Sequence, residues 1–245
     1  PQPPPKDCTP SKFLKGILES GAGPYFDGVS FHAYDYTTGT GTGKYGNLNW
    51  QSMSDTTGPV LIAKTNYLRA LLAQYGFSQK YLLNTETAVF WGPNQDDPPC
   101  ALNAPADVEL TKVYYVIQTY AAAIAEGLKA NIWYAPLGGR CAALLNPDLS
   151  PKPAYNAYEF ALQELKKAIY LRQITEYPQV MGYEYLVDGK TLWVLWPLDG
   201  GSHTITLPKL PLEVNRIGDD GLPVQETSTN PLTIDLAPRF IEFGP

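Results

Sequence analysis

Glu86 is the residue of this sequence whose position most strongly suggests chemistry. It follows the apolar run Tyr81-Leu82-Leu83, and a carboxylate after such a run is costly to bury unless it is hydrogen-bonded or used. Two other apolar runs end comparably, one in His32 and Tyr34 and the other in Trp133 and Tyr134. Catalysis is therefore one interpretation of a carboxylate in this position. The structural alternative for Glu86 is a rim carboxylate, a helix cap or a salt-bridge partner.

The elements that would position these residues alternate along the first two thirds of the chain. Apolar strands are predicted over residues 26–34, 80–87 and 130–135. Amphipathic helices are predicted from about residue 9 to residue 20, and over residues 60–75, 107–127 and 152–169. Strands and helices in this order indicate parallel β/α units, whose ligand-binding and catalytic groups gather at the carboxyl ends of the strands. We therefore expect the polar residues that end the three strands to lie together.

The pattern changes near Gln173. Short alternating segments separated by turns predict strands over residues 180–187, 191–197, 203–207, 212–217, 232–236 and 239–243. Asp188-Gly189 is a typical hairpin turn between the first two of them. This spacing predicts an antiparallel sheet or a small sandwich. The chain is therefore divided into a β/α part, residues 1–172, and a β part, residues 173–245.

The composition excludes several classes of partner. The chain has 245 residues, 44% of them hydrophobic, and a net charge of −6, so a nucleic acid backbone or an anionic membrane surface would be repelled. No apolar run approaches the roughly 20 residues that span a bilayer. With two histidines and no paired cysteine motif, neither a metal nor an organic cofactor is expected. The proline-rich opening of the chain is typical of the middle of a longer protein, or of a mature or trimmed one.

The three cysteines leave two possibilities open. Cys100 and Cys141 each fall in a loop after a predicted strand, where a disulfide could join neighbouring loops. Cys8 would then be free or would pair with a partner outside this chain. Three reduced thiols are equally compatible with the sequence. A disulfide would suit a secreted or cell-surface protein, and the sequence does not otherwise indicate a location.

Several short segments resemble the last third of a clan A glycoside hydrolase barrel, and above all the group around family 39, the β-xylosidases and α-L-iduronidases. The segments, in chain order, are Phe26-Asp27-Gly28-Val29-Ser30-Phe31-His32-Ala33-Tyr34, Leu82-Leu83-Asn84-Thr85-Glu86-Thr87, Ile132-Trp133-Tyr134 and Lys152-Pro153-Ala154-Tyr155. They are similar to the sixth, seventh and eighth strands and to the start of the last barrel helix. Pro238-Arg239-Phe240-Ile241-Glu242 looks like the closing strand of the small β-sandwich that follows in such proteins. The resemblance implies the last three β/α units of a (β/α)8 barrel followed by that sandwich.

The resemblance also implies roles for particular residues. Glu86 would be the nucleophile of a retaining glycosidase, and Tyr34 would hydrogen-bond it. Substrate would be bound by four residues, namely His32, Asn84, Trp91 and Trp133. The alternatives are structural: a satisfied buried histidine, a packed rim tyrosine, a core tryptophan at Trp133 and a loop-packing tryptophan at Trp91.

The sequence departs from the family pattern in one respect that matters for activity. Retaining hydrolysis needs two carboxylates about 5–5.5 Å apart, and the acid–base Glu of the clan's fourth strand has no counterpart here. A whole barrel typically takes about 250 residues and eight strands, whereas this chain supplies three. We expect the rest to come from an amino-terminal portion or from another copy of the chain. This chain alone is expected to be inactive, because losing the acid–base group costs roughly 10²–10⁴-fold in rate.

Two other functions fit the same sequence. One is a non-catalytic carbohydrate-binding or scaffold protein built on a degenerate barrel. The other is an assembly module whose open sheet edges pair between subunits.

Overall fold

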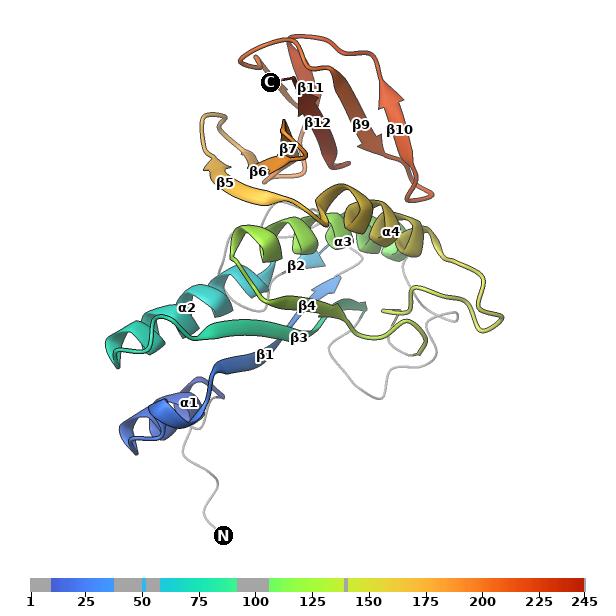
Figure 1. The fold of residues 1–245 in the computed structure, drawn as a ribbon. Helices are drawn as coiled ribbons and strands as arrows, with labels where there is room; N and C mark the ends of the chain where they lie inside the picture. Colours follow the sequence, from blue (N-terminus) through green and yellow to red (C-terminus); the bar gives the residue numbers. More distant parts are fainter. Residues whose placement is uncertain (1–9, 38–49, 52–57, 92–105, 139–140, 245) are drawn as a thin grey trace.

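The fold has three layers, with two sheets on either side of a layer of helices (Figure 1). The computed structural model describes residues 10–37, 50–51, 58–91, 106–138 and 141–244. A sheet of mainly parallel strands lies on one side of helices α3 (Val108–Ala125) and α4 (Pro153–Leu165), and an antiparallel sheet lies on the other. The predicted order of a parallel β/α part followed by an antiparallel β part is therefore confirmed.

The first sheet contains three parallel strands. They are β1 (Gly28–Thr37), β3 (Tyr81–Trp91) and β4 (Ala130–Trp133), and β3 is in the middle. A short strand, β2 (Trp50–Gln51), pairs antiparallel with the last two residues of β1. Both long strands run further than the sequence predicted, so His32, Tyr34 and Glu86 lie within strands and not at their ends.

Helix α1 (Pro10–Glu19), a short 3₁₀ turn (Gly23–Tyr25) and helix α2 (Val60–Gln74) flank this sheet. Leucines from both helices pack on Leu82 of β3 and form a small apolar cluster. Helix α2 is capped by Tyr75 and followed by Gly76, which has φ +81°, a left-handed conformation that favours glycine just after a helix end. Helix α4 begins with Pro153, whose missing N–H costs nothing in a first turn.

The second sheet has six antiparallel strands in the order β10-β9-β12-β7-β6-β5, and a separate pair, β8 with β11, packs on it. The bounds of these strands are β5 Ile169–Ile174, β6 Val180–Val187, β7 Lys190–Pro197, β8 His203–Ile205, β9 Glu213–Ile217, β10 Pro223–Glu226, β11 Leu232–Ile234 and β12 Arg239–Phe243. The hairpin turn predicted between β6 and β7 is present at Asp188-Gly189. Strands β5 and β10 were not predicted, and the helix predicted to reach residue 169 ends at Leu165.

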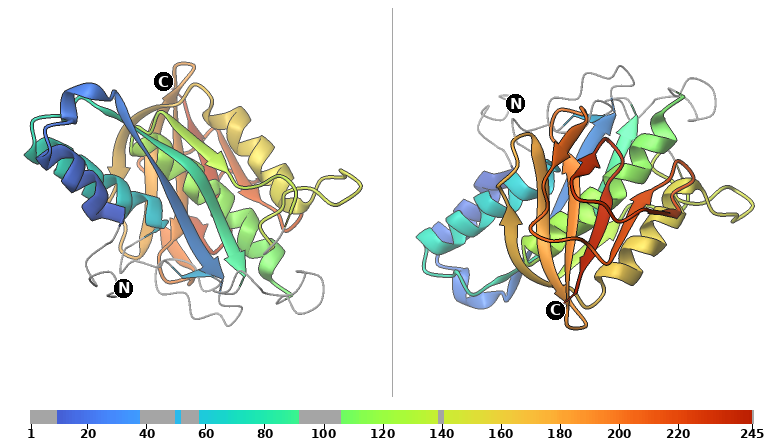
Figure 2. Two further views of the ribbon diagram at one scale, coloured as in Figure 1. Left: turned by 90° about the horizontal axis from the view of Figure 1, so that it is seen from below. Right: turned by 90° about the horizontal axis from the view of Figure 1, so that it is seen from above.

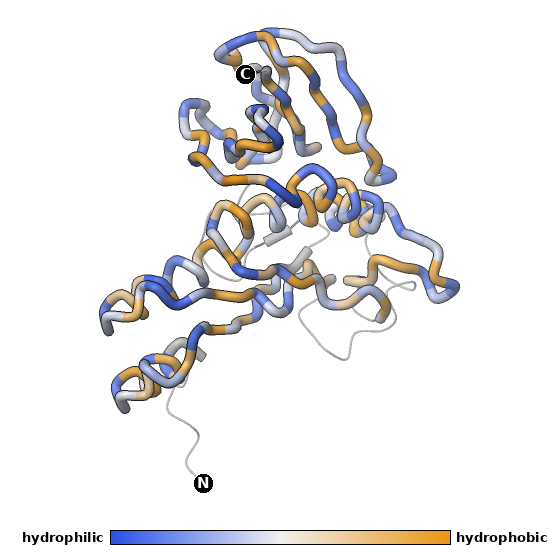
Figure 3. Tube along the Cα trace, viewed as in Figure 1, coloured by the Kyte–Doolittle hydropathy of each residue, from blue (hydrophilic) through white to orange (hydrophobic). Residues whose placement is uncertain are grey.

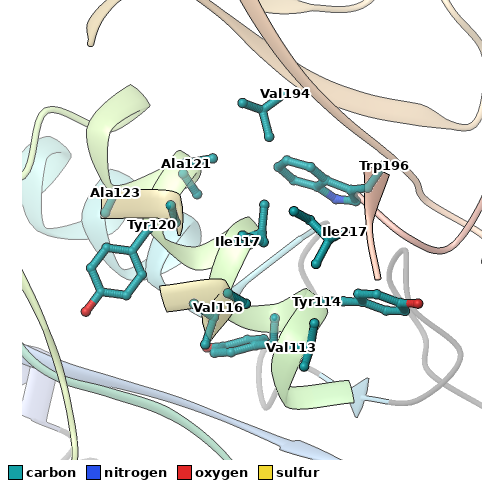
Figure 4. Packing of buried hydrophobic residues seen from close by; sticks show 14 of the residues in the cluster. Val113, Tyr114, Val116, Ile117, Tyr120, Ala121, Ala123, Val194, Trp196 and Ile217 are labelled. Carbon is teal, nitrogen blue, oxygen red and sulfur yellow. The ribbon is translucent and has the colours of Figure 1, made fainter. Parts of the chain in front are cut away.

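Helix α3 forms the centre of the molecule because apolar residues surround it on all sides. Residues from Thr111 to Ala123 are buried, which is typical of a helix packed on two faces. Figures 2 and 3 show this helix lying between the two sheets. Ile117 lies close to Trp196 of β7 and Ile217 of β9 (Figure 4). The hydroxyl of Tyr185 on β6 donates to the main-chain oxygen of Ala121 at 2.7 Å. One continuous core therefore joins the two sheets through α3 and α4.

A buried lysine fastens the loop after β4 to this central helix. Lys112 of α3 is 1% exposed and donates to the main-chain oxygens of Cys141 and Ala143, at 2.8 and 2.6 Å. Glu109 lies 2.9 Å from the same amine. Cys141 is disulfide-bonded, which excludes the alternative of three reduced thiols. Cys8 and Cys100 lie outside the described residues, so the pairing of Cys100 with Cys141 stays a prediction.

The buried amine of Lys112 predicts a pH-dependent stability. Burial lowers the pKa of Lys112 from its usual 10.5 to about 8, although Glu109 opposes the shift. Between these two pH values the unfolded chain binds more protons than the folded chain, so stability rises with pH; below pH 8 this contribution is constant. In urea unfolding, wild type should gain about 2 kcal/mol relative to Lys112→Met between pH 7.5 and pH 9.5. Parallel pH curves for the two proteins would contradict this expectation.

Candidate active site

An irregularity in β3 decides which way Glu86 points. Phe31 of β1 is paired with Asn84, but the next residue, His32, is paired with Glu86, so Thr85 has no partner on β1. This is a β-bulge, one extra residue inserted in one strand. Without it, Glu86 would alternate onto the same face as Leu82 and Asn84, which is covered by helices. The bulge moves Glu86 to the opposite face, which it shares with His32.

The Glu86 carboxylate is held by two side chains of the neighbouring strand. The hydroxyl of Tyr34 donates a short hydrogen bond to Oε2 of Glu86. Nδ1 of His32 lies 3.1 Å from the same oxygen. The Glu86 side chain is 31% exposed and that of His32 is 52% exposed, so solvent reaches both groups. The prediction that these three residues lie together is therefore met in the structure.

Aromatic rings fix the position of Tyr34. Its ring centroid lies 4.7 Å from that of Phe90 on β3 and 6.4 Å from that of Tyr134, which follows β4. The ring of His32 meets it edge to face at 6.1 Å. Tyr34 is thus packed between β3 and the segment that follows β4. This packing restricts rotation of its side chain, so its hydroxyl stays directed at Glu86.

Polar contacts on the helix-covered face of the sheet join β1 and β3 to the helices. Asp35, the residue after Tyr34, is fully buried and accepts hydrogen bonds from the main-chain nitrogen of Val60 at 3.0 Å and the hydroxyl of Tyr115 at 2.8 Å. It thereby joins β1 to the first residue of α2 and to α3. Burial and the Asp35 charge raise the pKa of Tyr115 well above its usual value, so this hydroxyl keeps its proton. The hydroxyl of Thr87 on β3 lies 3.4 Å from the hydroxyl of Thr119 on α3.

Two of the residues predicted to bind substrate lie on the helix-covered face. Asn84 is fully buried, and its side-chain nitrogen donates to Oδ1 of Asn131 at 2.7 Å. Trp133 is paired with Thr87, packs edge to face on Tyr115 of α3, and donates from Nε1 to the main-chain oxygen of Ala142 at 2.8 Å. Neither position suits a side chain that contacts a sugar. Trp133 instead occupies the core position that was its structural alternative.

The third of these residues, Trp91, is not brought to Glu86 by the structure. It is the last residue of β3, is partly buried, and is paired with Thr37. Strand alternation after the bulge places it on the same face as Thr87 and Val89, away from the carboxylate.

Tyr134 occupies the position that sequence reasoning assigned to Trp133. Its side chain is 50% exposed and its ring meets that of Tyr34. Since Trp133 shares the face of Thr87, the next residue turns to the face of Glu86. The alternation of side chains along β4 could have identified Tyr134 from the sequence. It would have done so only if the pairing register across the β-bulge in β3 had been known.

A cavity lined by described residues begins beside His32 and Tyr34. It has a volume of about 1030 Å³ and runs from His32 and Tyr34 along β1 to helices α1 and α2. Most of its wall is apolar. Lys64 of α2 lies in it and donates to the main-chain oxygen of His32 at 2.7 Å. Burial lowers the pKa of Lys64, and the negative charge of Asp35 opposes this shift.

Glu86, Tyr34 and His32 together can supply one reactive carboxylate and two side chains that position it. No second carboxylate shares its face in the described parts of β1, β3 and β4. The described residues also contain no group of three or more His, Cys, Asp or Glu that could hold a metal ion. No helix in the described part of the chain is both long and apolar enough to cross a membrane.

Comparison with known proteins identifies the fold. No family model matches the sequence, and neither does any curated protein. Among solved structures, the chain is similar to a family 39 glycoside hydrolase from Bacteroides cellulosilyticus WH2, with a TM-score of 0.64 at 18% identity over 94% of this chain. It is also similar to a family 51 arabinofuranosidase from Xanthomonas axonopodis pv. citri, with a TM-score of 0.53 at 15% identity over 95% of the chain.

A third similar structure is the β-porphyranase of glycoside hydrolase family 86 from Bacteroides plebeius, with a TM-score of 0.57 at 14% identity over 94% of this chain. The chain spans about half the length of these structures, namely 46%, 56% and 44% of the family 39, 51 and 86 proteins. At these identities the likeness concerns the fold. The resemblance to clan A glycoside hydrolases is thereby confirmed at the level of the fold.

Proposed function

We propose that this chain forms the nucleophile-bearing half of a retaining glycoside hydrolase. One observation carries the proposal: a partly exposed carboxylate, Glu86, is held by Tyr34 and His32 on the face of the parallel sheet opposite the helices. The fold around it is shared with glycoside hydrolases over nearly the whole chain. The β-bulge keeps this carboxylate on that face, and two neighbouring side chains orient it. A carboxylate so placed is suited to nucleophilic attack on a substrate and not to packing in the core.

In the proposed first step Glu86 attacks the anomeric carbon of a bound glycoside. A bond forms between a Glu86 oxygen and that carbon while the bond to the leaving oxygen breaks, and an acid group protonates the leaving oxygen. Both donors contact Oε2 of Glu86, so Oε1 is the oxygen proposed to attack. In the second step water attacks the glycosyl-enzyme, and the configuration at the anomeric carbon is retained. The acid–base group must come from residues outside the described strands.

The proposed sugar-contacting residues follow from which side chains share the face of Glu86. Tyr134 presents an exposed ring beside Tyr34 and takes the stacking role that sequence reasoning gave to Trp133. His32, half exposed, is available to sugar hydroxyls as well as to Glu86.

The test compares this chain alone with the same chain joined to the polypeptide encoded before Pro1. Chromogenic aryl glycosides should be hydrolysed by the joined form only, and proton NMR of the first product should show retained anomeric configuration. A joined form that binds oligosaccharides without turnover would favour the non-catalytic carbohydrate-binding alternative. Hydrolysis with inverted configuration would contradict the nucleophile role.

Removing the hydroxyl of Tyr34 should impair turnover without preventing binding. In the joined protein, Tyr34→Phe is expected to lower kcat about 10–100-fold with a small change in KM, because a hydrogen bond to a charged group contributes roughly 1.5–3 kcal/mol. Steady-state kinetics on an aryl glycoside measure both parameters. Tyr158→Phe, a matched change on helix α4, serves as the control and should leave kcat unchanged. An equal loss in both variants would show that the effect is not specific to the carboxylate.

A further inference from the structure

The main-chain pairing of β3 is irregular on both sides of Glu86. On the β1 side Thr85 is the extra residue of the bulge and has no paired residue. On the β4 side pairing passes from Asn84 directly to Thr87, so neither Thr85 nor Glu86 is paired there. A bulge disrupts the ladder and bends the strand locally. Among the described residues, His32 is therefore the one strand residue paired with Glu86.

Thr87 is the first residue after the bulge at which β3 is again paired on both sides. It is paired with Ala33 of β1 and with Trp133 of β4. Its side chain is fully buried on the helix-covered face, where its hydroxyl lies 3.4 Å from that of Thr119 on α3. Because Glu86 is the preceding residue, a contact that holds Thr87 also limits the movement of Glu86.

The hydroxyl of Tyr115 joins this position of β3 to β1. Tyr115 lies on α3 one turn before Thr119, and its hydroxyl donates to Oδ2 of Asp35 at 2.8 Å. Burial raises the pKa of Tyr115, and side-chain hydrogen bonds with Thr87 and Thr119 oppose this rise. The ring of Tyr115 meets that of Trp133, which is the β4 residue paired with Thr87. One hydroxyl of α3 therefore connects β1 with β3.

This connection repeats, on the other face of the sheet, the contact between Tyr34 and Glu86. Tyr34 contacts a residue that lies two positions before its own paired residue on β3, namely Glu86. Asp35 is connected in the same diagonal direction to Thr87. Successive side chains point to opposite faces of a sheet, so the two contacts lie on opposite sides of the same pair of strands. A shift of β1 along β3 would therefore disturb both contacts together.

We propose that Tyr115 is a positioning residue for the nucleophile. Its hydroxyl holds Asp35 and Thr87 together on the helix-covered face. The two strands then keep the register in which Tyr34 contacts Glu86 on the opposite face. The inference rests on the proposed function and deepens it, because it names a residue that acts on the site without contacting substrate. Tyr115 is fully buried, so it acts through the two strands.

The test compares two buried tyrosine hydroxyls, one between α3 and each sheet. Tyr115→Phe keeps the ring and removes the hydroxyl. In the joined protein it should lower kcat about 10–100-fold with little change in KM, because a small displacement of a reacting group costs that much in rate. Tyr185→Phe removes the hydroxyl that donates to the main-chain oxygen of Ala121 at 2.7 Å, and it should leave kcat unchanged. Thermal unfolding measures the loss of stability, which a purely structural role would give in both variants.

A second readout uses this chain alone and does not depend on turnover. With tyrosines labelled at the ring carbon that bears the hydroxyl, NMR reports the hydrogen bond of Tyr34, and Tyr34→Phe identifies its signal. That signal should move in Tyr115→Phe and stay in place in Tyr185→Phe. Thr119→Val and Thr119→Ser keep the test independent of whether Tyr115→Phe folds. Only Thr119→Val removes the hydroxyl beside Thr87, so only this variant should move the Tyr34 signal.

Three results would overturn the proposal. They are an unchanged Tyr34 signal in both Tyr115→Phe and Thr119→Val, an equal change in Tyr185→Phe, and a wild-type kcat for Tyr115→Phe in an active joined protein. A Tyr34 signal that moves as expected, in a protein whose joined form hydrolyses no glycoside, would support the positioning by Tyr115 and count against the proposed function alone.

Discussion

Replacing Glu86 with Gln is expected to reduce glycoside hydrolysis by the joined protein about 10³-fold or more, with little change in its stability. The amide has nearly the same shape and can still accept from Tyr34, but it carries no negative charge and cannot attack the anomeric carbon. Because the Glu86 side chain is partly exposed, the change creates no buried cavity and no unpaired buried charge. Initial rates on an aryl glycoside and a thermal unfolding curve measure the two effects.

A control and a rescue experiment separate this role from a general electrostatic effect. Glu159→Gln makes the same chemical change at an exposed position of α4 and should leave the rate unchanged. Glu86→Ala leaves space for a small anion, so added azide should restore cleavage of an activated glycoside and yield the glycosyl azide of inverted configuration. Full activity in Glu86→Gln, or no response of Glu86→Ala to azide, would argue against the nucleophile assignment.

The second large effect concerns the contact between the antiparallel sheet and helix α4. Gly221 lies in the turn between β9 and β10 with φ +78°, and a Cβ added there would lie 1.9 Å from the main-chain oxygen of Pro153. The same turn accepts a hydrogen bond from Asn156 of α4 at 2.9 Å, through the main-chain oxygen of Asp220. Gly221→Ala should therefore lower the free energy of unfolding by about 3–5 kcal/mol, combining backbone strain with displacement of the turn from α4.

Gly189 provides a matched control for this substitution. It has φ +84° in the turn between β6 and β7, and nothing lies within 4 Å of an added Cβ. Gly189→Ala should cost only about 1–2 kcal/mol, the strain of an L-residue in the left-handed region. Urea unfolding midpoints of the two variants give the difference. Equal losses would show that the contact between Gly221 and α4 contributes nothing to stability.

The arrangement of the elements could be predicted from the sequence because hydrophobic periodicity and turn residues agree along most of the chain. Strand β5 was missed because its sequence, Ile169-Tyr170-Leu171-Arg172-Gln173-Ile174, has no clear alternation, and at the end of a helical segment it can be taken for more helix. Strand β10 was missed because its residues are mostly exposed and include Pro223, which is tolerated at the start of an edge strand.

The residues around Glu86 could be predicted only in part. His32, Tyr34 and Glu86 were found because polar residues after apolar runs are unusual. The face on which the β3 residues from Glu86 onward lie could not be found, because it depends on one residue, Thr85, that has no paired residue on β1 and that no periodicity reveals. Regular alternation would even have placed Glu86 with Leu82 in the helix-covered core. Trp133 is buried because β4 alternates regularly from Asn131, which pairs with Asn84 on the helix-covered face, and Tyr134 therefore follows on the opposite face.

The most direct test of the central claim is to trap the covalent intermediate. A 2-deoxy-2-fluoro glycoside with an activated leaving group slows the second step of a retaining mechanism, so the sugar accumulates on the nucleophile. In the joined protein, peptide mass spectrometry should find one fluorosugar per chain, on the peptide that contains Glu86. A protein that hydrolyses glycosides but carries the label on another carboxylate would contradict the claim.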